Sequence, residues 1–480
     1  MTTELLIGGS WRPATGGVFE TVNPATEQVI DNVGYASRSD VAEAVAAARA
    51  AFTDPAWRDL LPVARAELLF KLADAVQANF EELARLETMD QGQPLDVARG
   101  VSVSNIVNHL RYYAGWVTKI EGRTAPVSIP DTLHYTRREP VGVCALITPW
   151  NFPLMILGWK LAPALATGNT VVIKPAEQTP LTSIRLAELA QQVGFPPGVV
   201  NLVTGDGAVG AALVEHPDVD KVSFTGSTEV GRSIVRASAG NFKRVTLELG
   251  GKAPSVIARD ADVDAAVGGN LGGALLNSGQ VCAAYTRFYV DARREDEFLT
   301  KMAAAVEAMT IGPGLEASTQ LGPLVSAQHL DKVTQMVAAG QNEGAELVTG
   351  GKRARDVGYF LQPTIFSGVT DAMSIATDEI FGPVLSVFRY SDQDELQALI
   401  DRANDTPYGL AATIWSKDLT AAHRLANGIR AGTIWINMPN PVDAAAPWGG
   451  FKASGWGREM GPYAIDAYTE VKGIFMHYGA

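Results

Sequence analysis

The stretch GVCALITPWNFPLMILGWKLAPALATGNTVVIKP, residues 142–175, joins two short apolar runs through a segment suited to a buried helix. Both runs are rich in Val and Ile and end at Pro, which favours strands. Three more β-rich runs follow, starting near residues 198, 221 and 244, with helix-like runs such as TSIRLAELAQQVG between them. This alternation predicts βαβ units on a parallel sheet over residues 141–257, with ligands at its carboxyl edge.

Part of this stretch has the length of a membrane span. Pro140–Trp159 holds 20 residues without a charge, about what a bilayer crossing needs. However, TPWNFP places two prolines and an asparagine near its centre, and Lys160 ends it. We therefore predict a buried strand (Gly142–Ile147), a turn and a buried helix, and no membrane partner.

The flanking regions extend the α/β pattern. The first ~110 residues are predicted to be helical after a short β start, because apolar residues recur at helical spacing. A second alternating section from about Lys252 to Phe451 predicts a second α/β domain. The tail YTEVKGIFMHYG (468–479) resembles one more strand. An apolar terminal strand needs a partner, and a neighbouring subunit is one option.

Composition restricts the function classes. Of 480 residues, 39 are Lys or Arg and 52 are Asp or Glu, giving a net charge of −13, which argues against a nucleic-acid partner. Two cysteines cannot form a disulfide framework and fit a reducing cytoplasm. MTTELLIGGSWRP lacks the features of a signal peptide. The six histidines show no ligand-like spacing, so no metal site is expected.

Cys282 lies in NSGQVCAAYTR (277–287), among small and polar residues. Such neighbours let a substrate carbon approach the sulfur, but they also permit close packing, so both a nucleophile and a core residue remain open. Cys144 lies within the apolar run GVCALI and is expected to be inert core.

Two further side chains fit chemistry at a sheet edge. Glu248, before the Gly-Gly turn of LELGGK, is either an exposed strand end or a base facing a cleft. Asn151 stands between Pro149 and Pro153, which restrict its backbone. Its amide is therefore either an oxyanion donor or the cap of its own turn.

Three loops could meet a dinucleotide. GDGAVG (205–210) and GSTEVG (226–231) both follow a predicted strand and open a predicted helix, as a phosphate-binding loop should. The sequence does not choose between them, and plain tight turns explain both. Lys174 and Glu177 follow another strand, where an acid can accept the hydroxyls of an adenosine ribose. A solvated loop is the alternative.

Seven motifs together resemble the aldehyde dehydrogenase superfamily, in its NAD(P)-dependent, CoA-independent, hydrolytic form. They cover nearly the whole chain in order: TPWNFPL, IKPAEQTP, FTGSTEVG, LELGGK, GQVCAA, EIFGPV and PWGGFKASGWGRE. The resemblance implies an α/β fold with a Rossmann-like NAD-binding domain (1–118 and 139–250), a catalytic domain (251–451) and a small β oligomerisation element (119–138 and 452–480). It also implies a homo-oligomer, a dimer or tetramer.

The resemblance assigns a role to each matched residue. It implies Cys282 as the nucleophile, Glu248 as the general base and Asn151 as the oxyanion donor. Cofactor contacts would come from Trp150, Lys174, Glu177, Gly226, Ser227, Glu379 and Phe381. GDGAVG would lie near the adenine and would not bind the phosphates. The implied activity is oxidation of an aldehyde to the acid with NAD, through a thioester that water hydrolyses.

The substrate prediction depends on the expected pocket walls, which are Phe152, Trp159, Tyr285 and Trp448. Trp448 also resembles the aminoaldehyde-oxidising branch of the family. That branch often carries acids before its YYA helix, whereas SVSNIVNHLRYYA here has none and contains Arg111. SGWGREMG resembles enzymes of aromatic and arylalkyl aldehydes. We therefore expect an aromatic or medium-length apolar aldehyde, with aminoaldehyde or betaine aldehyde as the alternative.

Two other classes of protein share some of these features. A cysteine-dependent hydrolase would use Cys282 and Asn151 but leaves Glu177 and Glu379 unexplained. A catalytically silent dinucleotide-binding protein would bind cofactor without turnover. NADH formation discriminates both from a dehydrogenase.

Overall fold

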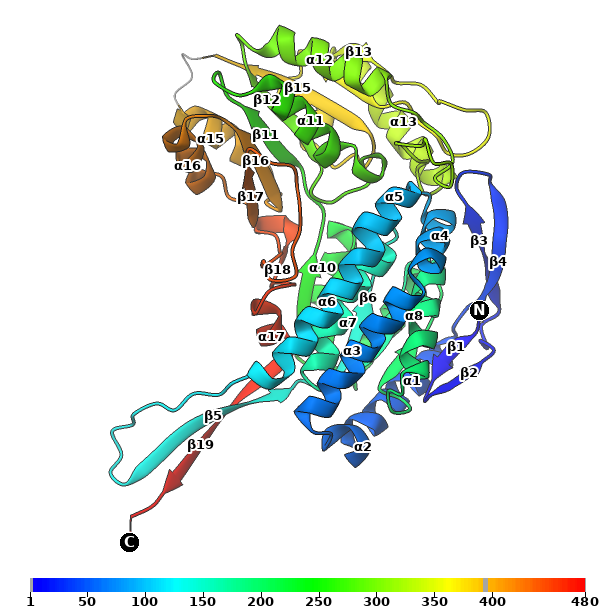
Figure 1. Cartoon of the computed structure of the whole chain (residues 1–480), viewed down its shortest axis with the longest axis vertical. Coiled ribbons are helices and arrows are strands. Elements are labelled where there is room, and N and C mark those ends of the chain that lie inside the picture. The colour runs from blue at the N-terminus through cyan, green and yellow to red at the C-terminus, as the bar shows by residue number, and fades with distance from the viewer. Residues whose placement is uncertain (1–2, 392–395, 480) are drawn as a thin grey trace.

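Of the section expected to form one parallel sheet, residues 141–257, the strands up to Glu248 form the centre of the first of two large sheets (Figure 1), whereas residues 253–257 join the second. The computed structural model describes residues 3–391 and 396–479. Five strands lie parallel in the order β10 (Arg244–Glu248), β9 (Lys221–Thr225), β6 (Val143–Ile147), β7 (Thr170–Lys174) and β8 (Val200–Leu202). Antiparallel strands extend both edges: β18 (Gly455–Trp456) at β10, and β1 (Leu5–Ile7) with β2 (Ser10–Arg12) at β8.

Helices cover both faces of this sheet because alternate residues of each strand point to opposite sides. Cys144 and Leu146 belong to the core formed with α3 (Pro62–Ala78), α4 (Phe80–Gln91), α6 (Ser104–Trp116), α7 (Pro153–Ala166) and α8 (Leu181–Gln192). Val143, Ala145 and Ile147 belong to the opposite core, with α1 (Arg38–Thr53), α9 (Gly207–Glu215) and α10 (Thr228–Ser238). The predicted strand, turn and buried helix are thus confirmed as β6 and α7. Within the described residues, we find no helix with the length and apolar character to cross a membrane.

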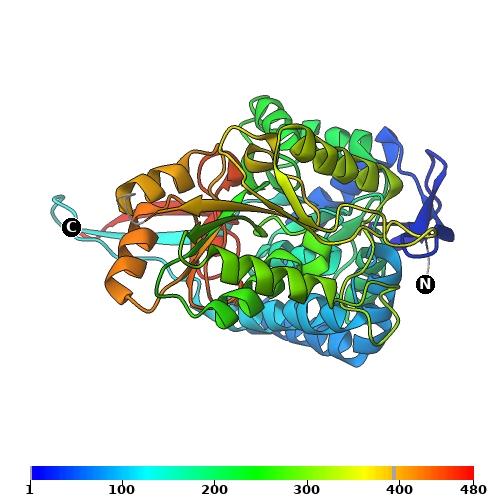
Figure 2. The same ribbon diagram turned by 90° about the horizontal axis from the view of Figure 1, so that it is seen from above.

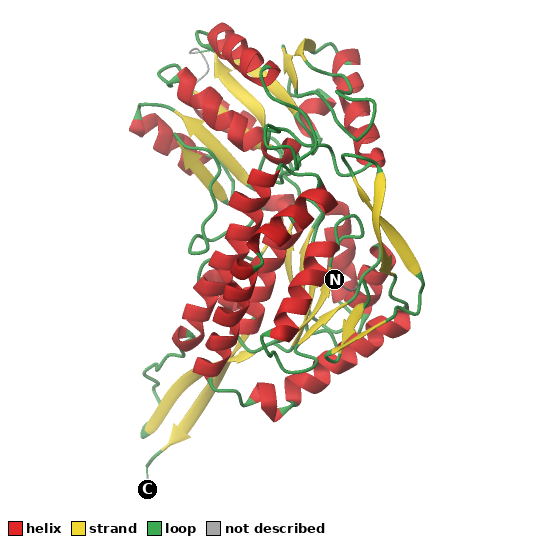
Figure 3. Cartoon of the chain, turned by 45° about the vertical axis from the view of Figure 1, so that its right-hand side comes forward, coloured by secondary structure: helices red, strands yellow, loops and turns green. Residues whose placement is uncertain are grey.

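The second sheet confirms the second α/β section. Its order is β13 (Glu346–Thr349), β14 (Thr364–Ser367), β15 (Val384–Tyr390), β12 (Tyr285–Asp291), β11 (Ala253–Ile257), β16 (Ala411–Trp415) and β17 (Thr433–Ile436), parallel except for β13. One core includes α11 (Val263–Ala274) and α12 (Glu295–Glu307); the other includes α13 (Ala327–Asn342), α14 (Ser374–Thr377), α15 (Leu396–Asn404) and α16 (Leu419–Gly428). Figures 2 and 3 show that helices lie on both sides of the strands in the two large sheets.

The tail forms the predicted strand, and its partner lies in the same chain. β19 (Thr469–His477) pairs antiparallel with β5 (Thr132–Pro140), and this two-stranded ribbon projects away from both large sheets (Figure 1). The residues just before β19 do not belong to this ribbon. β18 pairs with β10 of the first large sheet, and Tyr468 is buried in a core beside that sheet. β18 and Tyr468 therefore pack on the first sheet, whereas Met460 packs in a core of the second. The assignment of 452–480 to an oligomerisation element, like the rest of the domain division, stays a prediction.

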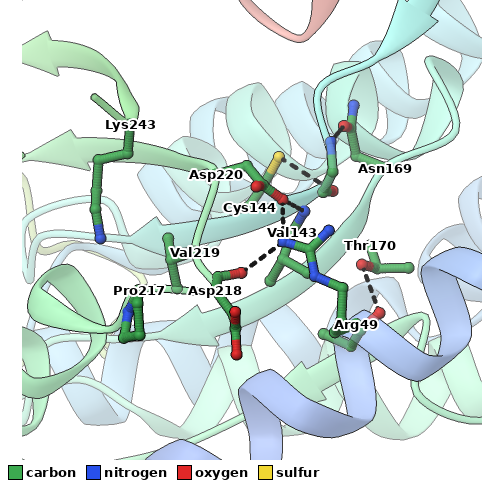
Figure 4. A network of polar contacts seen from close by, with 12 residues as sticks. Arg49, Val143, Cys144, Asn169, Thr170, Pro217, Asp218, Val219, Asp220 and Lys243 are labelled. Carbon is green, nitrogen blue, oxygen red and sulfur yellow. Dashed lines mark hydrogen bonds and ion pairs between the residues drawn. The ribbon is translucent and has the colours of Figure 1, made fainter. Parts of the chain in front are cut away.

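Asp220, which directly precedes β9, links the amino ends of β6 and β9 through a hydrogen bond, at the edge of the sheet opposite the one where ligands are expected (Figure 4). Its carboxylate accepts the Val143 N–H at 2.7 Å and pairs with Arg49 of α1. Cys144 lies beside this network, and its thiol contacts the Gly142 carbonyl. Burial raises the pKa of Cys144 to about 12. This cysteine is therefore an unreactive core residue, as its sequence context predicts.

Candidate active site

Polar residues gather at the carboxyl edge of the first sheet. Asn151 lies in the loop after β6, Lys174 ends β7, Gly226 follows β9 and Glu248 ends β10. Parallel strands bring these ends to one side, which is where open α/β sheets bind ligands.

Two adjoining cavities run along this edge. The first, of about 240 Å³, is lined by Asn151, Cys282, Glu379 and Phe381. The second, of about 550 Å³, is lined by Lys174, Glu177 and residues of α9 and α10. Both share Pro149, Trp150, Thr225, Gly226 and Ser227 as walls. The predicted cofactor residues are thus divided between two adjoining cavities, and Asn151 and Cys282 line the first of them, whereas Glu248 lines neither.

The chain reaches Cys282 through a left-handed turn. Asn277 and Ser278 have φ values of 49° and 57°, and Gly279 has φ 73°. Non-glycine residues in this region are uncommon and signal local strain. A Cβ on Gly279 would lie 2.3 Å from the Gly382 carbonyl oxygen. The turn leaves the Cys282 side chain partly exposed at the cavity wall.

Asn151 is joined to the same turn. Its Nδ2 donates to the Gln280 carbonyl at 2.8 Å, while Asn277 Nδ2 donates to the Asn151 carbonyl at 2.8 Å. A side-chain amide nitrogen carries two N–H donors, so a second can serve a ligand. The amide therefore holds the cysteine turn and does not cap its own loop.

Glu248 is a buried acid that directly precedes Leu249 and Gly250, two residues that line the first cavity. Neither of its carboxyl oxygens has a hydrogen-bond partner among the described residues. Burial raises the pKa of Glu248 well above its usual value, and the nearby Glu459 raises it further. Burial also raises the pKa of Cys282, and the charge of Glu248 adds to that rise. Both shifts favour the protonated form of each group.

A buried ion pair beside Glu248 was missed from the sequence. Lys160 Nζ lies 2.5 Å from Glu459 Oε1, and Ser223 donates to the same oxygen at 2.8 Å. Lys160 appeared only as the end of an apolar run, and Glu459 as the last letter of a motif. Neither pattern indicates that helix α7 and the segment after β18 meet here.

The second cavity carries the features of a nucleotide site. Lys174 Nζ lies 3.6 Å from Glu177 Oε2, and burial lowers the pKa of Lys174. Ser227 Oγ caps α10 by accepting the Val230 N–H at 3.3 Å. Gly226 is required for packing, since a Cβ there would lie 2.4 Å from the Phe224 ring. The GDGAVG loop starts α9, and its helix glycines line only this second cavity.

Glu379 and a group of rings close the first cavity. Glu379 Oε1 accepts the Gly251 N–H at 2.8 Å, and burial raises the pKa of Glu379 to about 7. The Trp150 ring lies 5.2 Å from Phe381 and 5.1 Å from His329 between centroids. His329 and Lys332, which also line the cavity, were missed because no motif marks helix α13.

The expected substrate walls belong to one apolar cluster with Cys282, and its aromatic members include Phe152, Trp159, Tyr285, Trp435 and Trp448. Trp435, which lies 6.0 Å from Tyr285 and 6.1 Å from Trp448 between ring centroids, was missed because its run resembled an ordinary core strand. Trp159 Nε1 donates to Asn105 Oδ1 at 2.7 Å. Arg111 points elsewhere: it pairs with Asp74 at 3.0 Å and is 46% exposed, so it does not charge this cluster.

Comparisons with known proteins agree with this geometry. The profile of the Aldehyde dehydrogenase family matches residues 11–474. Retinaldehyde dehydrogenase 3 of Mus musculus is 47% identical over 98% of the chain and 92% of its own length. An aldehyde dehydrogenase of Bacillus cereus, solved with NAD⁺, is 46% identical with a TM-score of 0.97, covering 100% and 97% of the two chains. Betaine aldehyde dehydrogenase of Staphylococcus aureus, also with NAD⁺, is 39% identical with a TM-score of 0.97 over 99% and 95%. The chain therefore belongs to the aldehyde dehydrogenase family.

Proposed function

We propose that this aldehyde dehydrogenase uses NAD to oxidise an aromatic or medium-length apolar aldehyde to its acid, with Cys282 as nucleophile and Glu248 as general base. One observation carries the proposal: Cys282, Asn151 and Glu379 line a cavity that continues into the one holding Lys174 and Glu177. A hydrolase has no use for the second cavity, so that alternative loses its support.

The two adjoining cavities fit a dinucleotide by their donor set. The N-terminus of α10, capped by Ser227, offers free backbone N–H groups of the kind that bind phosphate. Lys174 and Glu177 would hold the adenosine ribose, and Glu379 the ribose next to the nicotinamide. Trp150 and Phe381 would wall that end. NAD, when bound, accepts the hydrogen and electron pair that the substrate carbon loses.

Cys282 supplies the sulfur that attacks the aldehyde carbon. Since burial raises the pKa of this thiol, the S–H proton must pass to solvent water as the sulfur–carbon bond forms. The carbonyl oxygen then becomes an oxyanion, which the free N–H of Asn151 and the backbone N–H of Cys282 stabilise. Losing one such donor costs on the order of 10²–10³ in rate.

Glu248 acts in the second half of the reaction. After oxidation, the acyl group remains on the sulfur as a thioester, and water must attack it. Ionised Glu248 takes a proton from that water as the water oxygen bonds to the acyl carbon. The C–S bond then breaks, and Glu248 returns the proton to the departing sulfur, which releases the acid and the Cys282 thiol. Because burial raises the pKa of Glu248, the ionised fraction and the hydrolysis rate increase with pH.

The apolar substrate is supported by the aromatic cluster. Its rings are at most 6% exposed and line neither of the two cavities, so a substrate that reaches them from Cys282 would meet closely packed ring edges and faces. Asn105 of α6 is uncharged, and burial lowers the pKa of His109 to about 4, so this histidine is neutral as well. Asp443 is exposed and accepts the Ala445 N–H of its own loop. An ammonium entering here would lose hydration, and the buried acid near the cluster, Glu248, is the proposed base of the hydrolysis step.

The substrate proposal predicts higher kcat/KM for benzaldehyde, phenylacetaldehyde and hexanal than for 3-aminopropionaldehyde and betaine aldehyde. NADH absorbance near 340 nm follows each reaction. If either cationic aldehyde is preferred by more than about tenfold, or ~1.4 kcal/mol, betaine-type oxidation, as named for the Staphylococcus aureus neighbour, becomes the better proposal. A protein that forms no NADH with any aldehyde would contradict the proposed function itself.

NAD should be preferred to NADP, because the Glu177 carboxylate would repel a 2′-phosphate. Glu177→Ser should reduce the NAD advantage by roughly 1–3 kcal/mol, the contribution of a charge-assisted contact. Steady-state kcat/KM with each cofactor measures this. Glu215→Ser is the matched control, since Glu215 lines the same cavity but pairs with Arg38 at 2.8 Å. A wild-type preference for NADP would refute the ribose assignment.

We also propose that the enzyme is a cytoplasmic homo-oligomer, a dimer or tetramer. The support is the projecting two-stranded ribbon of β5 and β19, on which Val471 and Phe475 are each 60% exposed. Exposed apolar side chains on an isolated two-stranded ribbon are best explained by an interface with a second copy of the chain.

A further inference from the structure

Helix α4 carries two buried acids that the proposed mechanism does not use. Glu87 and Asp90 are at most 1% exposed and lie three residues apart, so they share one face of the helix. Burial raises the pKa of each to about 7. Two adjacent acids in a core are costly unless their oxygens are well paired, and here all four oxygens have partners.

The two carboxylates accept hydrogen bonds from the same two kinds of donor. Glu87 accepts the Leu154 N–H on Oε1 at 3.4 Å and the Thr182 hydroxyl on Oε2 at 2.7 Å. Asp90 accepts the Leu181 N–H on Oδ2 at 2.9 Å and the Thr21 hydroxyl on Oδ1 at 2.6 Å. One oxygen of each acid therefore binds the backbone at a helix start, and the other binds a threonine.

The two helices that receive these contacts lack caps of their own. α7 begins after Phe152 and α8 after Pro180, and neither residue provides a side-chain cap hydrogen bond. The first N–H groups of a helix have no partner within it, and an acid placed there is favourable. Glu87 and Asp90 provide from α4 the caps that the local sequence omits.

Both helix starts lie directly behind proposed active-site loops. Leu154 is three residues after Asn151, and Leu181 is four residues after Glu177. A helix is rigid relative to a loop, so fixing its first turn fixes one end of the loop before it. Glu87 thus lies behind the oxyanion donor, and Asp90 behind the adenosine-ribose carboxylate.

We propose that Glu87 and Asp90 are positioning residues that act on different halves of the site. Glu87 holds α7 so that Asn151 faces Cys282, and Asp90 holds α8 so that Glu177 faces the cofactor. This inference rests on the proposed roles of Asn151 and Glu177. A purely structural role predicts that loss of either acid affects both halves alike.

The test replaces each acid with an apolar residue of similar size that cannot accept a hydrogen bond. Glu87→Met should lower the rate of the pre-steady-state NADH burst, at saturating NAD, by about tenfold or more, because an ångström of misplacement can cost about 10²-fold. Its Kd for NAD, measured by protein fluorescence, should stay within about twofold. Asp90→Leu should do the reverse, raising Kd for NAD by about tenfold with the burst rate at saturation preserved.

Conservative variants and threonine variants provide the controls. Glu87→Gln and Asp90→Asn can still accept the helix N–H, and their NH₂ groups can donate to the threonine hydroxyls. Both should restore wild-type values. Thr182→Val and Thr21→Val remove only the second contact of each acid, so both kinetic parameters should change little. If the apolar variants do not fold, Glu87→Ala and Asp90→Ala test the same loss.

Two results would overturn the inference. One is an equal change of burst rate and Kd in both variants; the other is a lower Tm with unchanged kinetics per active site. Failure of the proposed function would give a different result: the wild type would show no NADH burst, so Glu87→Met could not be compared with it. The Kd for NAD of Asp90→Leu could still be compared with that of the wild type, and this would test the role of Asp90.

Discussion

Cys282→Ala should abolish NAD-dependent turnover while leaving NAD affinity unchanged. The thiol forms the only bond to substrate in the proposed reaction, and methyl hydrogens cannot replace it. Its loss should remove activity to background, while the nucleotide contacts from Lys174, Glu177 and Ser227 lie outside the change. Steady-state NADH formation gives the first result and NAD fluorescence titration gives the second.

The second cysteine is the matched control. Cys144 lies on β6 among apolar residues, away from the cavity that Cys282 lines. Cys144→Ala should therefore keep kcat and KM and reduce only stability, as small core deletions do. Substantial turnover by the Cys282 variant would show that another group carries the covalent step.

Glu248→Gln should stop the reaction after one turnover, with the acyl group still on Cys282. The amide has nearly the same shape as the acid but cannot take a proton from water. The oxidation step should survive and the hydrolysis step should not, so one equivalent of NADH appears per site and then stops. Intact-protein mass should show the acyl group added to the enzyme.

The pH dependence provides an independent check. Burial and Glu459 raise the pKa of Glu248, and the protonated acid is inactive as a base. In the wild type, the deacylation rate should rise as pH increases through that pKa, and in Glu248→Gln this rise should disappear. If the wild type is idle until CoA is added, a thiol and not water accepts the acyl group, and the role of Glu248 is wrong.

The sequence predicted the features that depend on local order along the chain. Alternating strand and helix patterns predicted both α/β sheets, and the strand ends predicted which side carries Asn151, Lys174 and Glu248. Each of these residues lies within two positions of Gly or Pro, at or just after the end of a strand where the chain must turn. Local pattern was therefore sufficient to place them at one edge.

Contacts between distant segments could not be predicted in this way. Trp435 lies on a strand whose pattern indicates only burial, and His329 on a helix whose pattern indicates only one apolar face. Lys160 and Glu459 are 299 residues apart in the chain and meet only because α7 packs against the segment that follows β18. For Arg111 the sequence suggested a contact that the structure does not have. We included Arg111 in the substrate prediction because of its position before YYA, but it lies on an exposed face of α6 and pairs with Asp74.

The late position of β18 in the chain has a consequence for synthesis on the ribosome. β10, which ends at Glu248, is complete about 200 residues before β18 covers its edge, a delay of roughly 10–40 s at usual elongation rates. During that interval the edge of β10, the strand that ends at the proposed base Glu248, is uncovered, and Glu459 has not yet been synthesised. The nascent chain therefore holds an unpaired strand edge, which is the kind of surface that chaperones protect from aggregation.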